Sequence, residues 1–103
     1  MRFLMRVTMP VDTVNKAMKK GTFGDTMGKI MAELKPEAAY FTAECGHRSG
    51  YLIVNMKDAN EMMKYGEPFF HAFEAEVDIM PVMTAEEIKK GGAYIEDAVK
   101  KFG

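Results

Sequence analysis

Apolar and polar residues alternate along parts of the chain, and this two-residue period is typical of β-strands with one buried face. The alternating stretches are residues 2–9, 38–56 and 76–83. The middle stretch is long enough for two strands, and Cys45-Gly46 at its centre predicts the turn of a hairpin. Pro81 predicts an edge position for the last strand, because proline has no N–H to donate to a neighbouring strand.

Elsewhere the apolar residues recur every three or four positions, which predicts amphipathic helices between and after the strands. After the first strand we expect two short helical pieces, one capped by Asp12 and one starting at Asp25 or Thr26. Together they would form one broken crossover helix. Pro36 ends it, because proline is not tolerated in the interior of a helix.

Two capping-box sequences, Asp58-x-x-Glu61 and Thr84-x-x-Glu87, mark the starts of the remaining helices. Gly66 and Pro68 are expected to interrupt the first of these helices, with a second piece restarting at the proline. The last helix is amphipathic, and Gly91-Gly92 is either its weak point or a point of close approach to another element.

These elements follow the order strand, helix, strand, strand, helix, strand and a final helix, which is a ferredoxin-like arrangement with an extra C-terminal helix. The predicted class is therefore α+β, with a βαββαβ antiparallel sheet in a single domain over residues 1–103. A chain of 103 residues that is 48% hydrophobic is large enough for one core. Right-handed crossovers place both main helices on one face of the sheet. Arg48 belongs to this helix side, near an open end where its head is expected to reach water.

Charge and cysteine content exclude several classes of partner. The chain has 14 Lys and Arg against 15 Asp and Glu, so it offers no basic surface to nucleic acid and no field that would attract an anionic membrane. No stretch approaches the roughly 20 apolar residues of a membrane span. A single cysteine closes no internal disulfide, and the N-terminal residues lack a signal-peptide pattern, so we expect a cytoplasmic protein.

One face of the predicted sheet carries no helices and combines polar, aromatic and aliphatic side chains. The candidate ligand-binding residues on this face are Arg6, Tyr40, Tyr51, Asn55 and Asp78. Such a surface is too apolar for water and too polar for an ordinary core, which predicts a homodimer through the sheet face that encloses a partly wet space. Arg6 either forms a structural ion pair with Asp78 or holds a carboxylate or enolate oxygen of a ligand.

Candidates for catalysis are few. Arg6 is one; His71 is the other, either a surface histidine on the aromatic helix or a general base or haem ligand. Cys45 and His47 offer two ligands where zinc needs three or four, so no metal site is predicted. The eleven methionines are spread over core-facing positions, which favours packing around an irregular cavity over a copper site. The sequence indicates no cofactor.

Four segments carry a resemblance to a known group of proteins. They are Arg2-Phe-Leu-Met-Arg-Val-Thr-Met-Pro10, Lys35-Pro-Glu-Ala-Ala-Tyr-Phe41, Glu67-Pro-Phe-Phe70 and Pro81-Val-Met-Thr84. The chain resembles the dimeric α+β barrels, and within them a small bacterial family of unknown function. The resemblance implies two ferredoxin-like subunits packed sheet to sheet. The wider group includes cofactor-free monooxygenases, isomerases, haem-degrading enzymes and stress-response proteins, and the absence of tryptophan here argues against the haem-degrading type.

Two function hypotheses follow. The first is a homodimeric small-molecule-binding protein, in the enzymatic version a cofactor-independent monooxygenase or isomerase acting on a small apolar or aromatic acid. The second is a non-catalytic dimeric module with a structural or stress-response role, whose sheet face is filled by the partner's side chains. Because proteins with many different functions share this fold, the fold alone does not favour either hypothesis.

Overall fold

Four antiparallel strands form the single sheet of the protein. A computed structural model describes residues 1–103 and places the strands at β1 (Arg2–Met9), β2 (Ala38–Glu44), β3 (His47–Asn55) and β4 (Glu76–Pro81). Their order across the sheet is β2-β3-β1-β4, so β1 is central and β4 lies at an edge, as Pro81 predicts. The hairpin has the predicted register, with Tyr40 opposite Tyr51. The turn residues Cys45 and Gly46 both have positive φ, at 51° and 79°.

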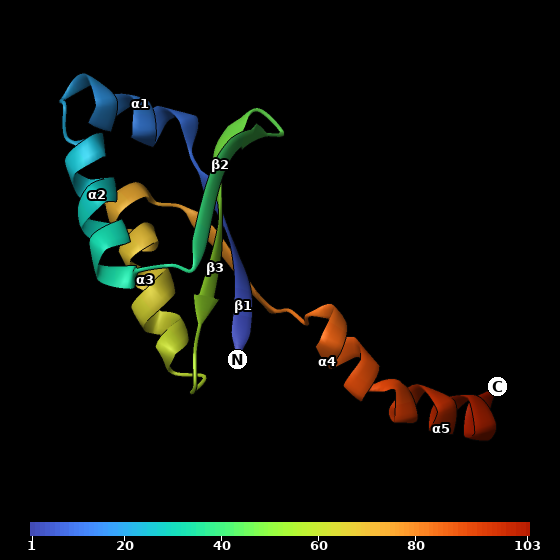
Figure 1. Ribbon diagram of the computed structural model, residues 1–103. Coiled ribbons are helices and arrows are strands. Elements are labelled where there is room, and N and C mark those ends of the chain that lie inside the picture. The colour runs from blue at the N-terminus through green and yellow to red at the C-terminus, as the bar shows by residue number, and fades with distance from the viewer.

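Three helices cover one face of this sheet, and the other face is bare (Figure 1). The covering helices are α1 (Val11–Lys19), α2 (Phe23–Leu34) and α3 (Glu61–Phe73). Two layers, one of helices and one of antiparallel strands, confirm the predicted α+β class and are consistent with a ferredoxin-like fold.

The crossover between β1 and β2 differs in detail from the prediction. It consists of two separate helices, α1 and α2, joined by a turn in which Gly21 has a φ of 75°. Pro10 is the N-cap of α1 and Thr22 is the N-cap of α2, and neither residue caps its helix with a side-chain hydrogen bond. Asp12 and Asp25 lie inside the first turns of these helices. The expected capping role of Asp12 is therefore wrong. Acidic residues in a first turn still favour the helix through its dipole.

Helix α3 runs without a break through Gly66 and Pro68, where the sequence predicts an interruption. Pro68 has no N–H to donate to the preceding turn, so one helical hydrogen bond is missing there. The apolar face continues across it nevertheless, because Tyr65, Phe69 and Phe73 are all buried against the sheet. Burial of this face outweighs the local preference for a break.

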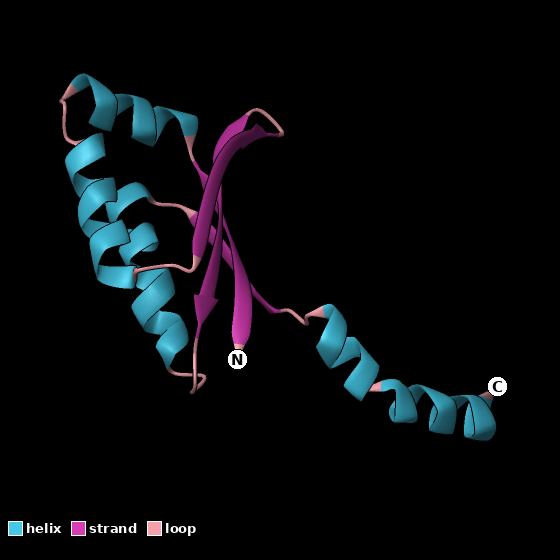
Figure 2. Cartoon of the chain, in the orientation of Figure 1, coloured by secondary structure: helices cyan, strands magenta, loops and turns pink.

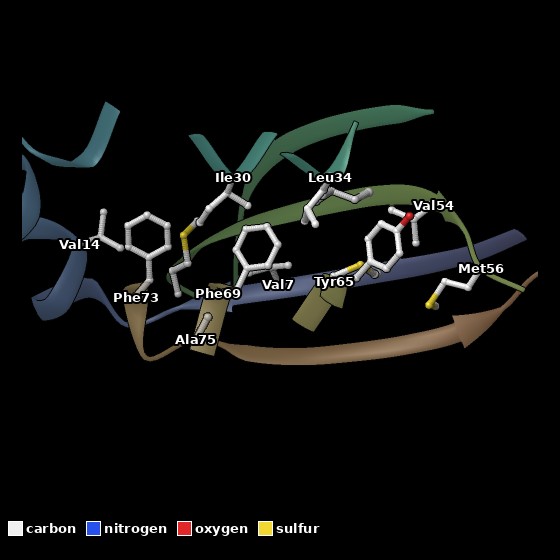
Figure 3. Packing of buried hydrophobic residues seen from close by; sticks show 13 residues of the cluster. Val7, Val14, Ile30, Leu34, Val54, Met56, Tyr65, Phe69, Phe73 and Ala75 are labelled. Carbon is white, nitrogen blue, oxygen red and sulfur yellow. The ribbon is translucent and has the colours of Figure 1, made fainter. Parts of the chain in front are cut away.

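The core lies between the helices and the sheet (Figure 3). Its largest fully buried side chains include Phe69 and Phe73 of α3, and Met5 and Leu52 of the two central strands. Methionine is flexible enough to fill irregular gaps, and Met5 and Met56 do so here, as the sequence predicts.

The position of the Arg48 side chain differs from the one expected from the sequence. Helix α1 lies near this end of β3, and the Arg48 Nη2 atom donates a hydrogen bond to Asn15 Oδ1 at 2.9 Å. The Nη1 atom is buried and has no hydrogen-bond partner in the protein. The head of Arg48 is therefore covered by the helix layer, where the sequence predicts that it reaches water.

The C-terminal residues form an arm that leaves the domain on the side opposite α1, α2 and α3 (Figures 1 and 2). It consists of α4 (Ala85–Lys90) and α5 (Gly92–Phe102), and the break at Gly91 confirms the predicted weak point. The capping box of Thr84 and Glu87 is formed as predicted. Neither helix buries a residue, and Tyr94 and Phe102 are more than four-fifths exposed. None of the helices is long and apolar enough to span a membrane.

Replacing Glu61 with glutamine is expected to make stability less sensitive to acid. Glu61 Oε2 accepts hydrogen bonds from the backbone N–H groups of Asp58 and Lys57, at 2.8 and 2.6 Å, and these bonds lower the pKa of Glu61 below its ordinary 4.5. A lowered folded-state pKa adds stability above the unfolded-state value, and this stability is lost as the pH falls through the folded-state value. Glutamine keeps an acceptor oxygen and does not titrate.

Urea unfolding from neutral pH to about pH 3 measures this effect. The free energy of unfolding should fall less steeply for Glu61→Gln than for the wild type. Glu96→Gln, on the exposed helix α5, is the control and should follow the wild-type curve. Identical pH dependence for Glu61→Gln and the wild type would contradict the prediction.

Candidate ligand-binding site on the open sheet face

The sheet face without helices brings together most of the residues that the sequence singles out. Arg6 on the central strand β1 lies opposite Tyr51 of β3 on one side and Asp78 of β4 on the other. Residues directly opposite one another in an antiparallel pair project from the same face, because side chains alternate along each strand. The three residues therefore form a row across the sheet.

Arg6 and Asp78 form the predicted ion pair. The Nη2 and Nε atoms of Arg6 lie 2.9 and 3.3 Å from Asp78 Oδ2. This hydrogen bond is the main reason that the pKa of Arg6 is raised above its ordinary value. The two side chains keep 42% and 52% of their surface exposed, so the pair is screened by water in one chain and adds little net stability.

Tyr51 is tied to Glu44 of the neighbouring strand. The Tyr51 hydroxyl donates a short hydrogen bond of 2.5 Å to Glu44 Oε1. This bond, with partial burial, raises the pKa of Tyr51. Tyr51 therefore keeps its proton at neutral pH and acts as a hydrogen-bond donor, not as a general base.

Of the two remaining candidate residues, Tyr40 belongs to this row and Asn55 does not. Tyr40 lies opposite Tyr51 on the outer strand β2, and 69% of its surface is exposed. Asn55 lies at the far end of β3, opposite Arg2. It is four residues from Tyr51, a distance of roughly 13 Å along a strand. One small ligand at Arg6 would therefore not reach Asn55.

A hollow of about 450 Å³ lies on this face, at the end where the β2–β3 hairpin turns. Its lining residues are Arg6, Thr8, Pro10, Glu44, Cys45, His47, Glu74 and Glu76. Three of them are glutamates, and the single arginine is already paired with Asp78, so the lining is acidic overall. The alternation of side chains along the strands could have placed Thr8, Glu44 and Glu76 on this face. Glu74 follows α3, and no strand pattern reaches it.

Cys45 and His47 reach the same hollow through the hairpin turn. His47 Nδ1 lies 3.0 Å from the Cys45 carbonyl oxygen, and both residues are exposed. No group of three or more histidine, cysteine or acidic side chains is close enough to hold a metal ion. The turn contributes lining to the hollow and shows no geometry of a metal or redox site.

His71 lies away from the open face, on α3 in the helix layer. Its side chain is 80% exposed, and its Nε2 atom lies 3.3 Å from Glu67 Oε1, one helical turn earlier. The structure therefore separates the two catalytic candidates, Arg6 and His71, onto opposite sides of the sheet. A shared active site for these two residues within one chain does not fit this geometry.

Comparison with known proteins identifies one family. A family model described as "Domain of unknown function (DUF3303)" matches residues 1–94, which include the whole sheet, the helix layer and α4. Only the greater part of α5 lies outside the match. No match was found among curated proteins.

Proposed function

Because the chain belongs to the DUF3303 family, whose description assigns no activity, we propose a function from its geometry: a homodimeric protein that binds a small molecule at the open sheet face. The observation that carries this proposal is the hollow of about 450 Å³, lined by seven polar or charged side chains and one proline. Its volume is in the usual range of small-molecule sites.

The apolar residues of the same face support a dimer. Met80 is 42% exposed and lies in one row across the sheet with Leu4 of β1 and Ile53 of β3, and Tyr40 on the opposite edge strand is 69% exposed. Contiguous apolar residues on one face mark interaction surfaces. The C-terminal arm leaves the sheet on this side (Figure 2). Its residues Ile95, Val99 and Phe102 form an exposed apolar stripe. A second copy packed on the open face would cover these residues and lie within reach of the arm. The occupant of the face is therefore proposed to be a second copy of this chain.

The charge of the hollow narrows the class of ligand. The sequence favours a small apolar or aromatic acid bound by Arg6, but Arg6 is already paired with Asp78, and Glu44, Glu74 and Glu76 would repel an acid. A ligand with an ammonium group and a short aromatic or aliphatic body is the better match. Its cation would replace water at the glutamates, and its body would extend out of the hollow past Arg6 toward Tyr51, which lies opposite Arg6 on β3.

We propose no reaction for this site. Arg6 and Tyr51 both have raised pKa values and keep their protons, so they donate hydrogen bonds but abstract no proton at neutral pH. Neither Arg6 nor Tyr51 therefore supplies the general base that a monooxygenase or isomerase reaction would need, and we restrict the proposal to binding.

Phenethylamine and phenylacetate, which share a ring and differ in charge, test the proposed ligand class. We expect phenethylamine to bind more tightly, as measured by backbone amide NMR shifts of residues around the hollow. Glu76→Gln should weaken phenethylamine binding about threefold to tenfold, because it removes one charge of the lining. Glu96→Gln, on α5, is the matched control and should have no effect. Tighter binding of phenylacetate, or no binding of either compound, would overturn the proposal.

A second candidate is a non-catalytic dimeric module, and the exposed arm favours it. Helices α4 and α5 bury none of their residues, which is unusual for helices with an apolar stripe and is typical of segments that pack on another chain. In this case the partner's side chains would fill the hollow. A protein that is dimeric and binds neither probe would support this candidate.

A further inference from the structure

A second cavity lies on the other side of the sheet, under the helix layer, and it is separate from the open-face hollow. It has a volume of about 250 Å³. Its apolar lining is Met9, Met18, Phe23, Met27 and Phe41. These residues come from β1, α1, α2 and β2, so the cavity lies between the crossover helices and the outer half of the sheet.

Arg48 is the one charged residue that lines this cavity. Its Nη2 atom is hydrogen-bonded to the neutral side chain of Asn15, and its Nη1 atom is buried without a partner. Arg48 takes part in none of the ion pairs of the chain, so no carboxylate oxygen lies within 4 Å of its guanidinium nitrogens. A buried guanidinium nitrogen with neither counter-ion nor acceptor is strongly unfavourable.

The shape of the cavity depends on a close approach between strands β2 and β3. Gly50 lies opposite Phe41, and a Cβ atom at Gly50 would come within 3.2 Å of the Phe41 ring. Glycine therefore lets the Phe41 ring approach the backbone of β3 closely. The lining is completed by the two hydroxyl residues Thr42 and Ser49, so the cavity combines one positive charge and two hydroxyl groups with five apolar side chains.

We propose that this cavity binds a small monocarboxylic acid with an aliphatic chain. The carboxylate would accept hydrogen bonds from the Arg48 guanidinium, which lines the cavity and has no carboxylate partner within the chain. The chain would lie among the methionine and phenylalanine side chains, and flexible methionines adapt to chains of different shape. At roughly 30 Å³ for each water-sized group, the cavity holds about eight such groups, which is the size of hexanoate.

The methyl groups of the methionines provide a direct test on the intact protein. The chain has eleven methionines, and Met9, Met18 and Met27 line the cavity, whereas Met80 lies on the open sheet face. In the ¹³C-methyl spectrum we expect hexanoate to shift the three cavity methionines in a saturable way and to leave Met80 unchanged. Hexanol, which has the same chain and no charge, should bind at least about tenfold more weakly.

Two variants complete the test. Arg48→Met should weaken hexanoate binding about tenfold or more and leave hexanol binding almost unchanged, because only the acid uses the guanidinium. Arg2→Met is the matched control, since Arg2 is a half-exposed arginine paired with Glu37 outside the cavity. If Arg48→Met does not fold, Met27→Trp keeps Arg48, fills the cavity and should abolish binding.

Each alternative outcome overturns the proposal. Equal binding of hexanoate and hexanol would show that Arg48 does not recognise the ligand. Shifts of Met80 without shifts of the three cavity methionines would assign the acid to the open face. No saturable shift at millimolar hexanoate would show that the cavity binds no such acid. The outcome is independent of the phenethylamine experiment, because the two sites share no lining residue.

Discussion

Replacing Phe69 with alanine is expected to lower the free energy of unfolding by about 3–5 kcal/mol, the usual effect of removing a fully buried phenylalanine ring. Phe69 is 1% exposed and lies in the middle of the core, between α3 and the sheet (Figure 3). Its loss removes buried apolar surface and leaves a cavity, because the ring's neighbours belong to different elements and can move in only partly. Urea unfolding monitored by circular dichroism measures the change.

Phe70→Ala is the matched control for this prediction. Phe70 is the next residue of the same helix and is 42% exposed, so its truncation should destabilise the protein by no more than about 1 kcal/mol. Similar losses for the two variants would contradict the packing of α3, and with it the claim that an apolar face carries this helix through Pro68.

Leu52→Asp is expected to unfold the protein at neutral pH, whereas Ile53→Asp is expected to leave it folded. Leu52 is completely buried under the helices, and its neighbour Ile53 lies on the open face. A carboxylate at residue 52 would have to be buried without a partner, which lowers the free energy of unfolding by several kcal/mol. This loss is comparable to the whole free energy of unfolding of a typical domain, about 5–15 kcal/mol. Burial would also raise the pKa of this carboxyl, so the loss of stability should be smaller near pH 4 than at pH 7.

The same pair of variants tests the proposed dimer. Ile53→Asp places a charge on the surface that we assign to the second copy, and like charges would then face each other across a two-fold axis. Native mass spectrometry should show a wild-type dimer and an Ile53→Asp monomer with an unchanged circular dichroism spectrum. A monomeric wild type would remove the partner from the proposed function. A dimeric Ile53→Asp would place the interface elsewhere.

The sheet was the most predictable part of the fold. The alternation in the strands specifies which residues share a face, so Arg6, Tyr51 and Asp78 were placed on one face, and the turn at Cys45-Gly46 sets the register of β2 against β3. The ion pair between Arg6 and Asp78 is present, and it is one of the two roles that the sequence leaves open for Arg6. Local patterns succeed here because side-chain alternation and turn geometry act over a few residues.

The acidic hollow was not predictable in the same way. Glu74 enters it from the end of α3, and Cys45 and His47 enter it from the hairpin turn, so its lining comes from segments far apart in the chain. The sequence predicted that Arg6 faces this region, and it did not predict how many carboxylates line the same hollow. For that reason we propose a cationic ligand for this face in place of the expected acid, since electrostatic preference depends on all charges within a few ångströms.

The sequence by itself determined the type and order of the elements, the two faces of the sheet and the residues that form the core, because these depend on periodicity and turn chemistry within short segments. Only the tertiary structure decided that α3 continues through Pro68, that Arg48 is covered by the helix layer, and that the C-terminal helices leave the domain. Each of these outcomes depends on packing between distant segments. The free energy gained by burying an apolar face, against the same chain or against another one, exceeds the local helix and turn preferences that can be recognised in the sequence.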